Sequence, residues 1–354
     1  MNEKGSIGIK ILVAILVILI IATAVLLAIK IKNSKAILTD NNLEAKKNEN
    51  KIEEEQKEPE KQVQIYSGTD RPIAVMIDNV GDALPQAGLN DAYIVYEIIA
   101  EGGLTRYMAV FKGVNLDKIG PVRSSRHYYL DYAMENDAIY VHYGWSPQAQ
   151  RDISKYKINN INGVTAPSTT FWRVKDKAAP HNAVTSTERI LNQAQKYGYR
   201  TTSDSKSILN YVTDEVNLET EDSIIATDIV IPYPSEKARF KYNEETSRYE
   251  RYTNGTLQKD WTTSEVVSTK NIIITFASNS TLNDGENKGR QNLDNIGDLK
   301  GYYITNGKAI EIVCSKTARN TKTVYKDLEG NIINVNDGNT FIEICPINTQ
   351  VTFE

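Results

Sequence analysis

An uncharged apolar run near the N-terminus constrains this chain more than any other feature. Residues Ile11 to Ile29 carry no charge, and a helix of that length spans roughly 28 Å, close to the hydrocarbon thickness of a bilayer. A cleaved signal peptide is the alternative, but its apolar region is usually about 7 to 15 residues long. Here the run continues into Lys30 and Lys32 without an A-x-A-like site. We therefore expect residues 1–32 to be a transmembrane signal anchor.

The stretch that follows the anchor is made of interleaved Glu and Lys. Residues 33–65 offer little apolar surface to bury, so they cannot offset the entropy cost of ordering. We expect a disordered charged linker with a reach of about 30 Å or more. A short helix held by Glu/Lys pairs is the alternative for its middle part. The remainder of the 354 residues has room for about two domains.

Composition bears on nucleic-acid, metal and disulfide chemistry. The net charge is -4 and the basic residues are scattered, without the basic stripe typical of nucleic-acid binding, so we expect no nucleic-acid partner. There is no CxxC or HExxH motif and the three histidines lie far apart, which predicts no metal site and no cofactor. For Cys314 and Cys345, a disulfide outside the cell and two small buried side chains both remain open.

The first folded part, residues 66–220, reads as an α/β domain with a mixed sheet and helices. The apolar run from Arg71 to Asn79 suits a strand buried on both faces. Open α/β sheets bind ligands at the carboxyl ends of such strands. Asp78 lies at that end and becomes a candidate catalytic carboxylate.

A hairpin is predicted around Gly102-Gly103, because β-branched and aromatic residues flank a pair that adopts positive φ. In a regular hairpin, the expected pairs are Glu101 with Leu104, Ile99 with Arg106, and Glu97 with Met108. The side chains of Glu97, Glu101 and Arg106 would then lie on one side of the sheet. Such a group is either a structural ion pair or a site with perturbed pKa values.

We name Glu97 and Glu101, with Asp78, as candidate catalytic residues, one of them acting as acid or base. On a strand, Glu97 and Glu101 would stand about 13 Å apart, which is too far for the carboxylate pair of a glycosidase. A helical segment would make them neighbours instead.

The segment IGPVRSSRHYYLDYAMEND, residues 119–137, sets two arginines around two serines. Ser124 or Ser125 can cap a helix that runs to about Asn136. Arg123 and Arg126 then oppose the helix dipole, which makes sense if they converge on an anion. That anion is an internal carboxylate or a ligand's carboxylate or phosphate; a mere surface location is the third alternative.

Arg106, Arg123 and Arg126 are therefore candidate binding residues. Tyr128 and Tyr129 would add stacking area beside them. His142, at the end of a strand predicted over residues 137–145, is a further binding candidate.

His181 precedes a helix expected from about Ser186 to Tyr197, and it is named as a binding candidate, with capping or packing as the alternative. Another helix is expected to start at Ser146-Pro147. A Ser/His/Asp triad has weak support, because no G-x-S-x-G text surrounds any serine.

The second folded part, residues 221–354, is predicted to be β-rich and sandwich- or barrel-like. Short strands alternate there with Asn-Gly or Gly-Asn turns. We see no constellation in it that suggests chemistry, so its expected role is a scaffold.

Several motifs in this order carry a family resemblance: RPIAVMIDN, QAGLNDAYIVYEIIAEGGLTRYMAVF, KIGPVRSSRHYYLDYA, AIYVHYG, GYYITNGKAIEIV and GNTFIEICP. The chain resembles the YerB-like family of predicted bacterial lipoproteins, a domain of unknown function, over about residues 65–346. The resemblance implies an extracytoplasmic location at the membrane. The chain departs from the family in lacking a lipobox cysteine, so the transmembrane helix would replace the lipid. The resemblance brings no catalytic assignment.

We thus expect a single-pass cell-membrane protein with its folded domains on the extracytoplasmic side. Its expected function is to bind an anionic cell-wall component such as peptidoglycan. One alternative is a peptidoglycan enzyme that cleaves glycan with a carboxylate acid or base. The other is a protein-interaction module of an envelope complex. The sequence does not decide whether the chain is an enzyme.

Overall fold

The computed structural model describes residues 12–35 and 61–354, which belong to two separate compact units. The first unit contains the helix Leu12–Lys35, with a mean hydropathy of 3.4 in its most apolar window, long and apolar enough to cross a membrane. This helix agrees with the expected single N-terminal apolar helix.

The expected linker, residues 33–65, lies for the most part outside the described residues. Its final residues belong to the second unit, Gln62–Glu354. There the backbone N–H groups of Gln64 and Ile65 donate to the carboxylate of Asp337, at 2.8 and 2.9 Å.

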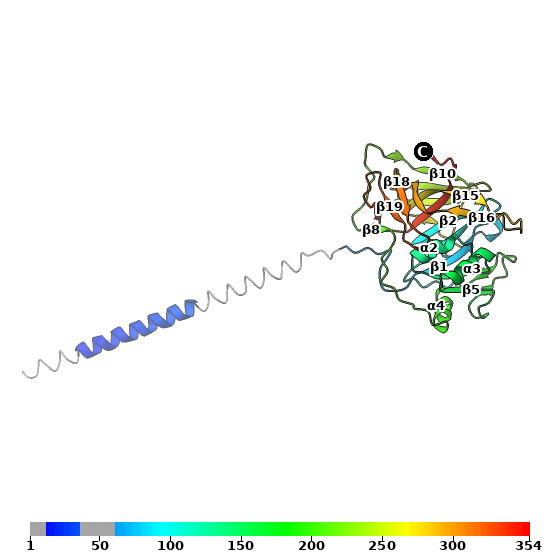
Figure 1. Cartoon of the computed structure of the whole chain (residues 1–354). Helices are drawn as coiled ribbons and strands as arrows, with labels where there is room; N and C mark the ends of the chain where they lie inside the picture. Colours follow the sequence, from blue (N-terminus) through cyan, green and yellow to red (C-terminus); the bar gives the residue numbers. More distant parts are fainter. Residues whose placement is uncertain (1–11, 36–60) are drawn as a thin grey trace, which may run out of the picture. The chain divides into compact units, whose positions relative to one another are not determined.

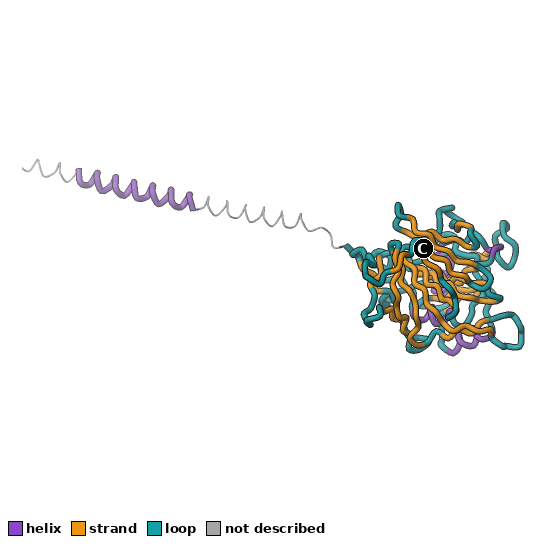
Figure 2. Tube along the Cα trace, turned by 90° about the horizontal axis from the view of Figure 1, so that it is seen from above, coloured by secondary structure: helices purple, strands orange, loops and turns teal. Residues whose placement is uncertain are grey.

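Strands account for most of the regular secondary structure of the second unit, and its helical segments are short (Figure 2). Twelve strands form one large sheet. Along its main path the order is β19 (Val324–Lys326), β18 (Lys308–Lys316), β17 (Gly297–Thr305), β15 (Asn271–Thr281), β21 (Thr340–Pro346), β2 (Ile94–Glu101), β3 (Leu104–Phe111), β1 (Ile73–Asp78), β4 (Ile139–His142) and β5 (Asn160–Asn162). Off this path, β16 (Gln291–Asp294) pairs with β15 and β9 (Ile224–Ile225) pairs with β18.

Strand β21 joins the two halves of the unit into this sheet (Figure 1). It runs parallel to both neighbours, so that Ile342 pairs with Ile273 of β15 on one side and with Tyr96 of β2 on the other. The expected α/β half with a mixed sheet, followed by a strand-rich half, is confirmed. A local pattern could not show that the sheet is shared, because strand order depends on pairings between distant segments. The boundary expected at residues 220 and 221 lies in the connection before β9 and stays a prediction.

A second sheet of six strands covers part of one face of the large sheet. Its strands are β10 (Asp228–Pro232), β11 (Lys237–Asn243), β12 (Arg248–Thr253), β13 (Thr256–Leu257), β14 (Ser268–Thr269) and β22 (Thr352–Phe353). The rings of Phe240 on β11 and Phe341 on β21 meet edge to face at 5.5 Å between centroids, within the core cluster that also holds Ile229 and Ile272. Burial of such apolar surfaces is the main stabilising term of a two-layer arrangement.

Two further sheets have two strands each, β8 (Asn210–Val212) with β20 (Asn334–Asn336) and β6 (Trp172–Arg173) with β7 (Ala183–Val184). There are also two short 3₁₀ segments, Gly81–Ala83 and Leu89–Asp91.

Three α-helices cover the two faces of the α/β half. The helices are α2 (Tyr129–Glu135), α3 (Pro147–Lys155) and α4 (Thr187–Lys196). Leu130 of α2 and Ile153 of α3 share one core cluster, whereas Ile190 of α4 belongs to the cluster on the other face. The start of α3 is confirmed: Pro147 is its first residue, and the Ser146 side chain accepts from the Ala149 N–H. The same capping by Ser186 confirms the start of α4.

Both cysteines are free and buried. Cys345 of β21 belongs to the core cluster that contains Phe341, and Cys314 of β18 belongs to the cluster that contains Ile342. Because alternate strand residues point to opposite faces, the two thiols lie on opposite sides of the large sheet. The structure therefore shows two small buried side chains and no bridge between them.

Candidate functional site

The candidate site begins where parallel strands end. Strands β1, β4 and β5 run parallel to one another, and their last residues are Asp78, His142 and Asn162. The prediction that Asp78 ends a strand buried along its length is confirmed, since every residue of β1 is buried. This is the edge of an α/β sheet at which ligands usually bind.

Asp78 contacts one guanidinium group and one imidazole ring. Its Oδ2 lies 2.9 Å from Arg123 Nε in an ion pair and 2.7 Å from His181 Nδ1. Backbone hydrogen bonds bring the segments of Asp78, Arg123 and His181 together. Arg123 N–H donates to Met76 O near the end of β1, and Val122 N–H donates to Ala183 O. Arg123 and His181, two predicted binding residues, are thus brought together by a carboxylate predicted to be catalytic.

The predicted hairpin exists, but its register differs from the regular one. Glu101 faces Leu104 as expected, whereas a shift between Ile99 and Glu101 makes Arg106 face Ile98 and makes Glu97 face Tyr107. A β-bulge adds one residue to a strand and reverses the side on which later residues point. The expectation that Glu97 and Glu101 share a face is therefore wrong.

Glu101 lies between two arginines. Its Oε2 is 3.2 Å from Arg106 Nη2, and its Oε1 accepts from Arg126 Nη2. Burial alone would raise the pKa of Glu101, but the guanidiniums of Arg106 and Arg126 outweigh it and hold the pKa below its ordinary value. Glu101 is therefore an anion at neutral pH and is poorly suited to act as a general acid.

The helix predicted from Ser124 or Ser125 starts later than expected. Helix α2 begins at Tyr129, and Ser125 instead forms a parallel bridge with Trp145. Serine is a favourable capping residue, but the Ser125 N–H donates to Gly144 O, so this segment pairs with the chain after β4. Arg123 and Arg126 lie on this extended segment rather than at a helix N-terminus.

The two tyrosines expected as stacking surfaces are buried instead. Tyr128 OH donates to Ile99 O, and Tyr129 OH donates to the backbone oxygens of Ile98 and Arg106. Asp131 and Glu135 of this helix are buried as well. Tyr128 and Tyr129 therefore support the β2–β3 hairpin and cannot stack on a ligand.

His142 is a structural residue in this fold, which corrects its prediction as a binding residue. It is fully buried, its Nδ1 lies 2.8 Å from Gly144 O and its Nε2 lies 3.1 Å from Asn160 Oδ1. Burial lowers its pKa to about 4, so the ring is neutral at physiological pH.

We call Asp78, Glu101, Arg106, Arg123, Arg126 and His181 the guanidinium cluster. The cluster has two groups of ion pairs, one around Asp78 and one around Glu101. They are adjacent, because Asp78 of β1 pairs in register with Arg106 of β3, which contacts Glu101. Three guanidiniums face two carboxylates, so the cluster carries an excess of positive charge. The cluster is partly open to solvent: the side chains of Glu101 and Arg123 are 25% and 23% exposed. Such a site can pair with an incoming anion.

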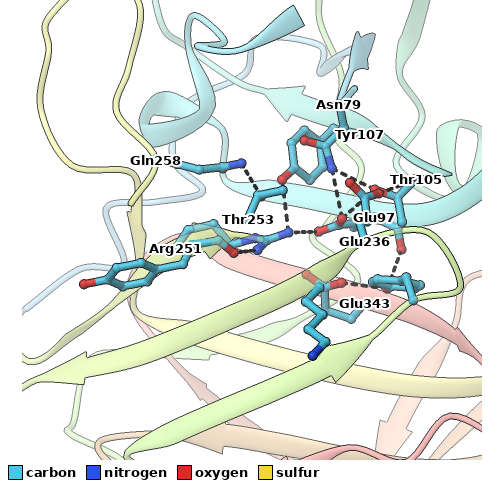
Figure 3. A network of polar contacts seen from close by, with 12 residues as sticks. Asn79, Glu97, Thr105, Tyr107, Glu236, Arg251, Thr253, Gln258 and Glu343 are labelled. Atoms are coloured by element: carbon cyan, nitrogen blue, oxygen red, sulfur yellow. Dashed lines mark hydrogen bonds and ion pairs between the residues drawn. The ribbon is translucent and has the colours of Figure 1, made fainter. Parts of the chain in front are cut away.

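Glu97 belongs to a separate, sealed network (Figure 3). Its Oε2 lies 2.7 Å from Arg251 Nη2, and both side chains are 0% exposed. Its Oε1 accepts from Asn79 Nδ2 at 3.0 Å and from Thr105 Oγ1 at 2.6 Å. The candidate catalytic role of Glu97 therefore conflicts with its position: no substrate reaches it without opening the core.

Two more carboxylates lie in the same network. Glu343 pairs in register with Glu97 and accepts from Tyr233 OH at 2.7 Å, while Glu236 accepts from the Thr105 N–H at 2.6 Å. Burial, followed by repulsion from Glu97, raises the pKa of Glu343 well above its ordinary value and raises that of Glu236 to about 7. Ionising all three carboxylates around one guanidinium would be unfavourable in free energy, because like charges repel in a buried site. Glu343 therefore retains its proton at neutral pH.

Two family descriptions match the folded unit. Residues 59–200 match "Protein of unknown function (DUF3048) N-terminal domain", and residues 229–342 match the corresponding C-terminal domain. A Bacillus subtilis (strain 168) protein described as "Putative lipoprotein YerB" is 30% identical over 284 residues, which cover 78% of this chain and 81% of that protein. The chain belongs to the DUF3048 family.

The fold is also similar to that in a crystal structure of the YerB protein from Bacillus subtilis. It matches with a TM-score of 0.71 at 29% identity, covering 80% of this chain and 94% of that chain. The resemblance to the YerB-like family is thereby confirmed. The N-terminal apolar helix and a relative described as a lipoprotein together indicate an envelope protein associated with a membrane.

Sequence reasoning about this DUF3048 chain missed Arg251, Glu236 and Glu343. Glu97 within an apolar strand does signal that a buried partner is needed. The sequence holds 41 basic residues, and nothing local selects one that is 154 positions away.

Removing Arg251 alone should destabilise this DUF3048 unit strongly. Arg251→Met leaves the Glu97 carboxylate buried without its cation, which should cost about 3–5 kcal/mol in the free energy of unfolding. The double variant Glu97→Gln/Arg251→Met removes both charges and should recover most of that loss. Urea unfolding of residues 62–354 measures both, and a double variant no more stable than Arg251→Met would show that the charge is not the cause.

The buried carboxylates should make stability depend on pH. Because the folded pKa of Glu236 is raised, the folded state binds more protons than the unfolded state between about pH 4.5 and 7. The stabilisation that Glu236 contributes is therefore fully present below this window, and roughly 3 kcal/mol of it is lost as pH rises through it. Glu236→Gln should flatten that fall in unfolding curves recorded across the window. The exposed turn residue Glu244 provides the control Glu244→Gln, and equal slopes in the two variants would contradict the assignment.

Proposed function

We propose that this DUF3048 chain is a single-pass membrane protein whose folded unit lies outside the cytoplasm and binds an anionic cell-wall polymer, with peptidoglycan as the candidate. The observation that carries the proposal is the guanidinium cluster at the carboxyl end of β1. Its positive excess and its partly exposed Arg123 suit carboxylate or phosphate groups of a polymer.

Binding is favoured over glycan cleavage by the state of the predicted catalytic carboxylates. Glu97 is sealed beside Arg251, and Asp78 is 1% exposed between Arg123 and His181. Glu101 is the partly exposed member, but the two arginines lower its pKa, whereas a glycosidase acid needs a raised one. The description of a relative as a lipoprotein supports the proposed extracytoplasmic side.

The binding proposal predicts that Arg123→Ala weakens the pelleting of residues 62–354 with purified peptidoglycan sacculi. Loss of one charged contact should reduce affinity about tenfold. The matched control is Arg239→Ala, which removes another partly exposed arginine paired with an aspartate, Asp228, in the six-stranded sheet. This unit is suitable for the test, because it is compact by itself and the crystallised relative matches 80% of the chain.

Modified sacculi separate the sources of the anion. Amidation of the free carboxylates should abolish pelleting if the peptide carboxylates are bound, and hydrofluoric acid treatment should abolish it if phosphate-linked polymers are bound. Arg123→Lys, which keeps a charge beside Asp78, controls for misfolding. Equal pelleting by Arg123→Ala and wild type would refute the proposal, and release of soluble fragments would point to the enzyme instead.

The proposed sidedness is tested with one introduced cysteine. Glu244 lies exposed in the turn between β11 and β12, and the native thiols Cys314 and Cys345 are buried. A membrane-impermeant maleimide should label the full-length Glu244→Cys variant in intact cells and leave the wild type unlabelled. Labelling of the variant only after lysis would place the folded unit on the cytoplasmic side.

A further inference from the structure

A cavity of about 250 Å³ opens beside β5, the edge strand of the large sheet, and is also lined by residues of α3 and of the segment after β4. The side chains that line it are uncharged and include Trp145, Tyr197, Asn160, Asn162 and Gln150. Pockets that enclose drug-sized ligands usually measure roughly 300–1,000 Å³. A smaller pocket with polar and aromatic walls suits one ring of a larger molecule.

Two aromatic side chains belong to this lining. Trp145 is half-buried and lies 5.5 Å from His142 between ring centroids, and His142 in turn lies 5.1 Å from Tyr140. Tyr197, at the end of α4, is 42% exposed. A flat aromatic side chain held by packing beneath it is a good platform for the apolar face of a ring.

Asn162 supplies a fixed hydrogen-bond donor. Its Oδ1 accepts from the N–H groups of Gly144 at 2.9 Å and Val164 at 3.1 Å, which sets the orientation of the amide. Its Nδ2 is buried and finds no acceptor within the part of the chain that the structure describes. Buried amides are normally satisfied, so this NH₂ group calls for an acceptor such as a ligand oxygen. The amides of Asn160 and Gln150 add capacity for hydroxyl groups.

The cavity and the guanidinium cluster are neighbours. Ser125 forms a bridge with Trp145 of the cavity, and the next residue, Arg126, holds Glu101 of the cluster. A polymer that carries both neutral rings and anionic groups can therefore contact both features at once.

We propose that the cavity is a carbohydrate subsite, which takes one neutral, hydroxyl-rich sugar ring through Trp145 stacking and the Asn162 donor. This proposal rests on the proposed function, since the cluster next to it would take the anionic groups of the same polymer. The uncharged lining separates the two roles: the cavity recognises the sugar, and the cluster recognises the charge.

Soluble oligomers of N-acetylglucosamine provide a neutral probe for residues 62–354. Ligand-observed NMR should show saturable binding by the wild type, and Trp145→Ala should weaken it at least about tenfold. Asn162→Asp keeps the acceptor oxygen for Gly144 and Val164 but removes the NH₂ donor, so it should weaken binding while the fold persists. Tyr252→Ala, a tyrosine of β12 outside the cavity lining, should bind like the wild type.

The outcomes separate this subsite from the proposed function. Binding of the neutral oligomers that is lost in Trp145→Ala and Asn162→Asp but kept in Arg123→Ala supports the subsite. Absence of oligomer binding, or equal binding by all variants, overturns the subsite. If sacculi still pellet through Arg123 in that case, the anion-binding function stands alone. If neither probe binds, both proposals fail.

Discussion

The buried ion pair between Arg251 and Glu97 is the interaction on which the arrangement of the two sheets depends. Arg251 comes from the six-stranded sheet and Glu97 from the large one, and neither side chain reaches water. Burying two charges costs several kcal/mol each, and good geometry with further hydrogen bonds offsets that cost. Because each charge is tolerable only beside the other, the pair favours one packing of the two layers over alternatives in which their apolar faces slide.

One bulge gives strand β2 two different roles. The register shift between Ile99 and Glu101 separates the faces on which Glu97 and Glu101 lie. Glu97 therefore supports the packing of the sheets, while Glu101 reaches the guanidinium cluster beside Arg106 and Arg126. A regular hairpin would have set both carboxylates on one face. Glu97 and Glu101 could not then have belonged to a sealed core on one face and a partly open site on the other.

Local features of the fold could be predicted from the sequence, and the non-local ones could not. The Gly102-Gly103 turn and the capping serines Ser146 and Ser186 act on residues within a few positions, and the predicted elements are present. No residue type in the sequence marks the bulge in β2, so the regular register predicted for the β2–β3 hairpin is wrong. Ser125 satisfies the rule for a cap, but pairing with Gly144 and Trp145 overrides it. Asp78, Glu101 and the three arginines of the cluster could be predicted as site residues, because they are charged residues in or beside apolar segments. Arg251 could not be predicted as the partner of Glu97.

The sealed network around Glu97 has more carboxylates than guanidiniums, whereas the guanidinium cluster has more guanidiniums than carboxylates. The excess charge is compensated differently in the two places. In the sealed network, Glu97, Glu236 and Glu343 outnumber Arg251, so the excess negative charge is removed by protons, as the raised pKa values of Glu236 and Glu343 show. In the guanidinium cluster the cations are in excess, and an arginine does not lose its proton at physiological pH. Proton exchange therefore cannot neutralise this excess. The proposed anionic ligand would offset it, and the exposed parts of Arg123 and Glu101 give such a ligand access.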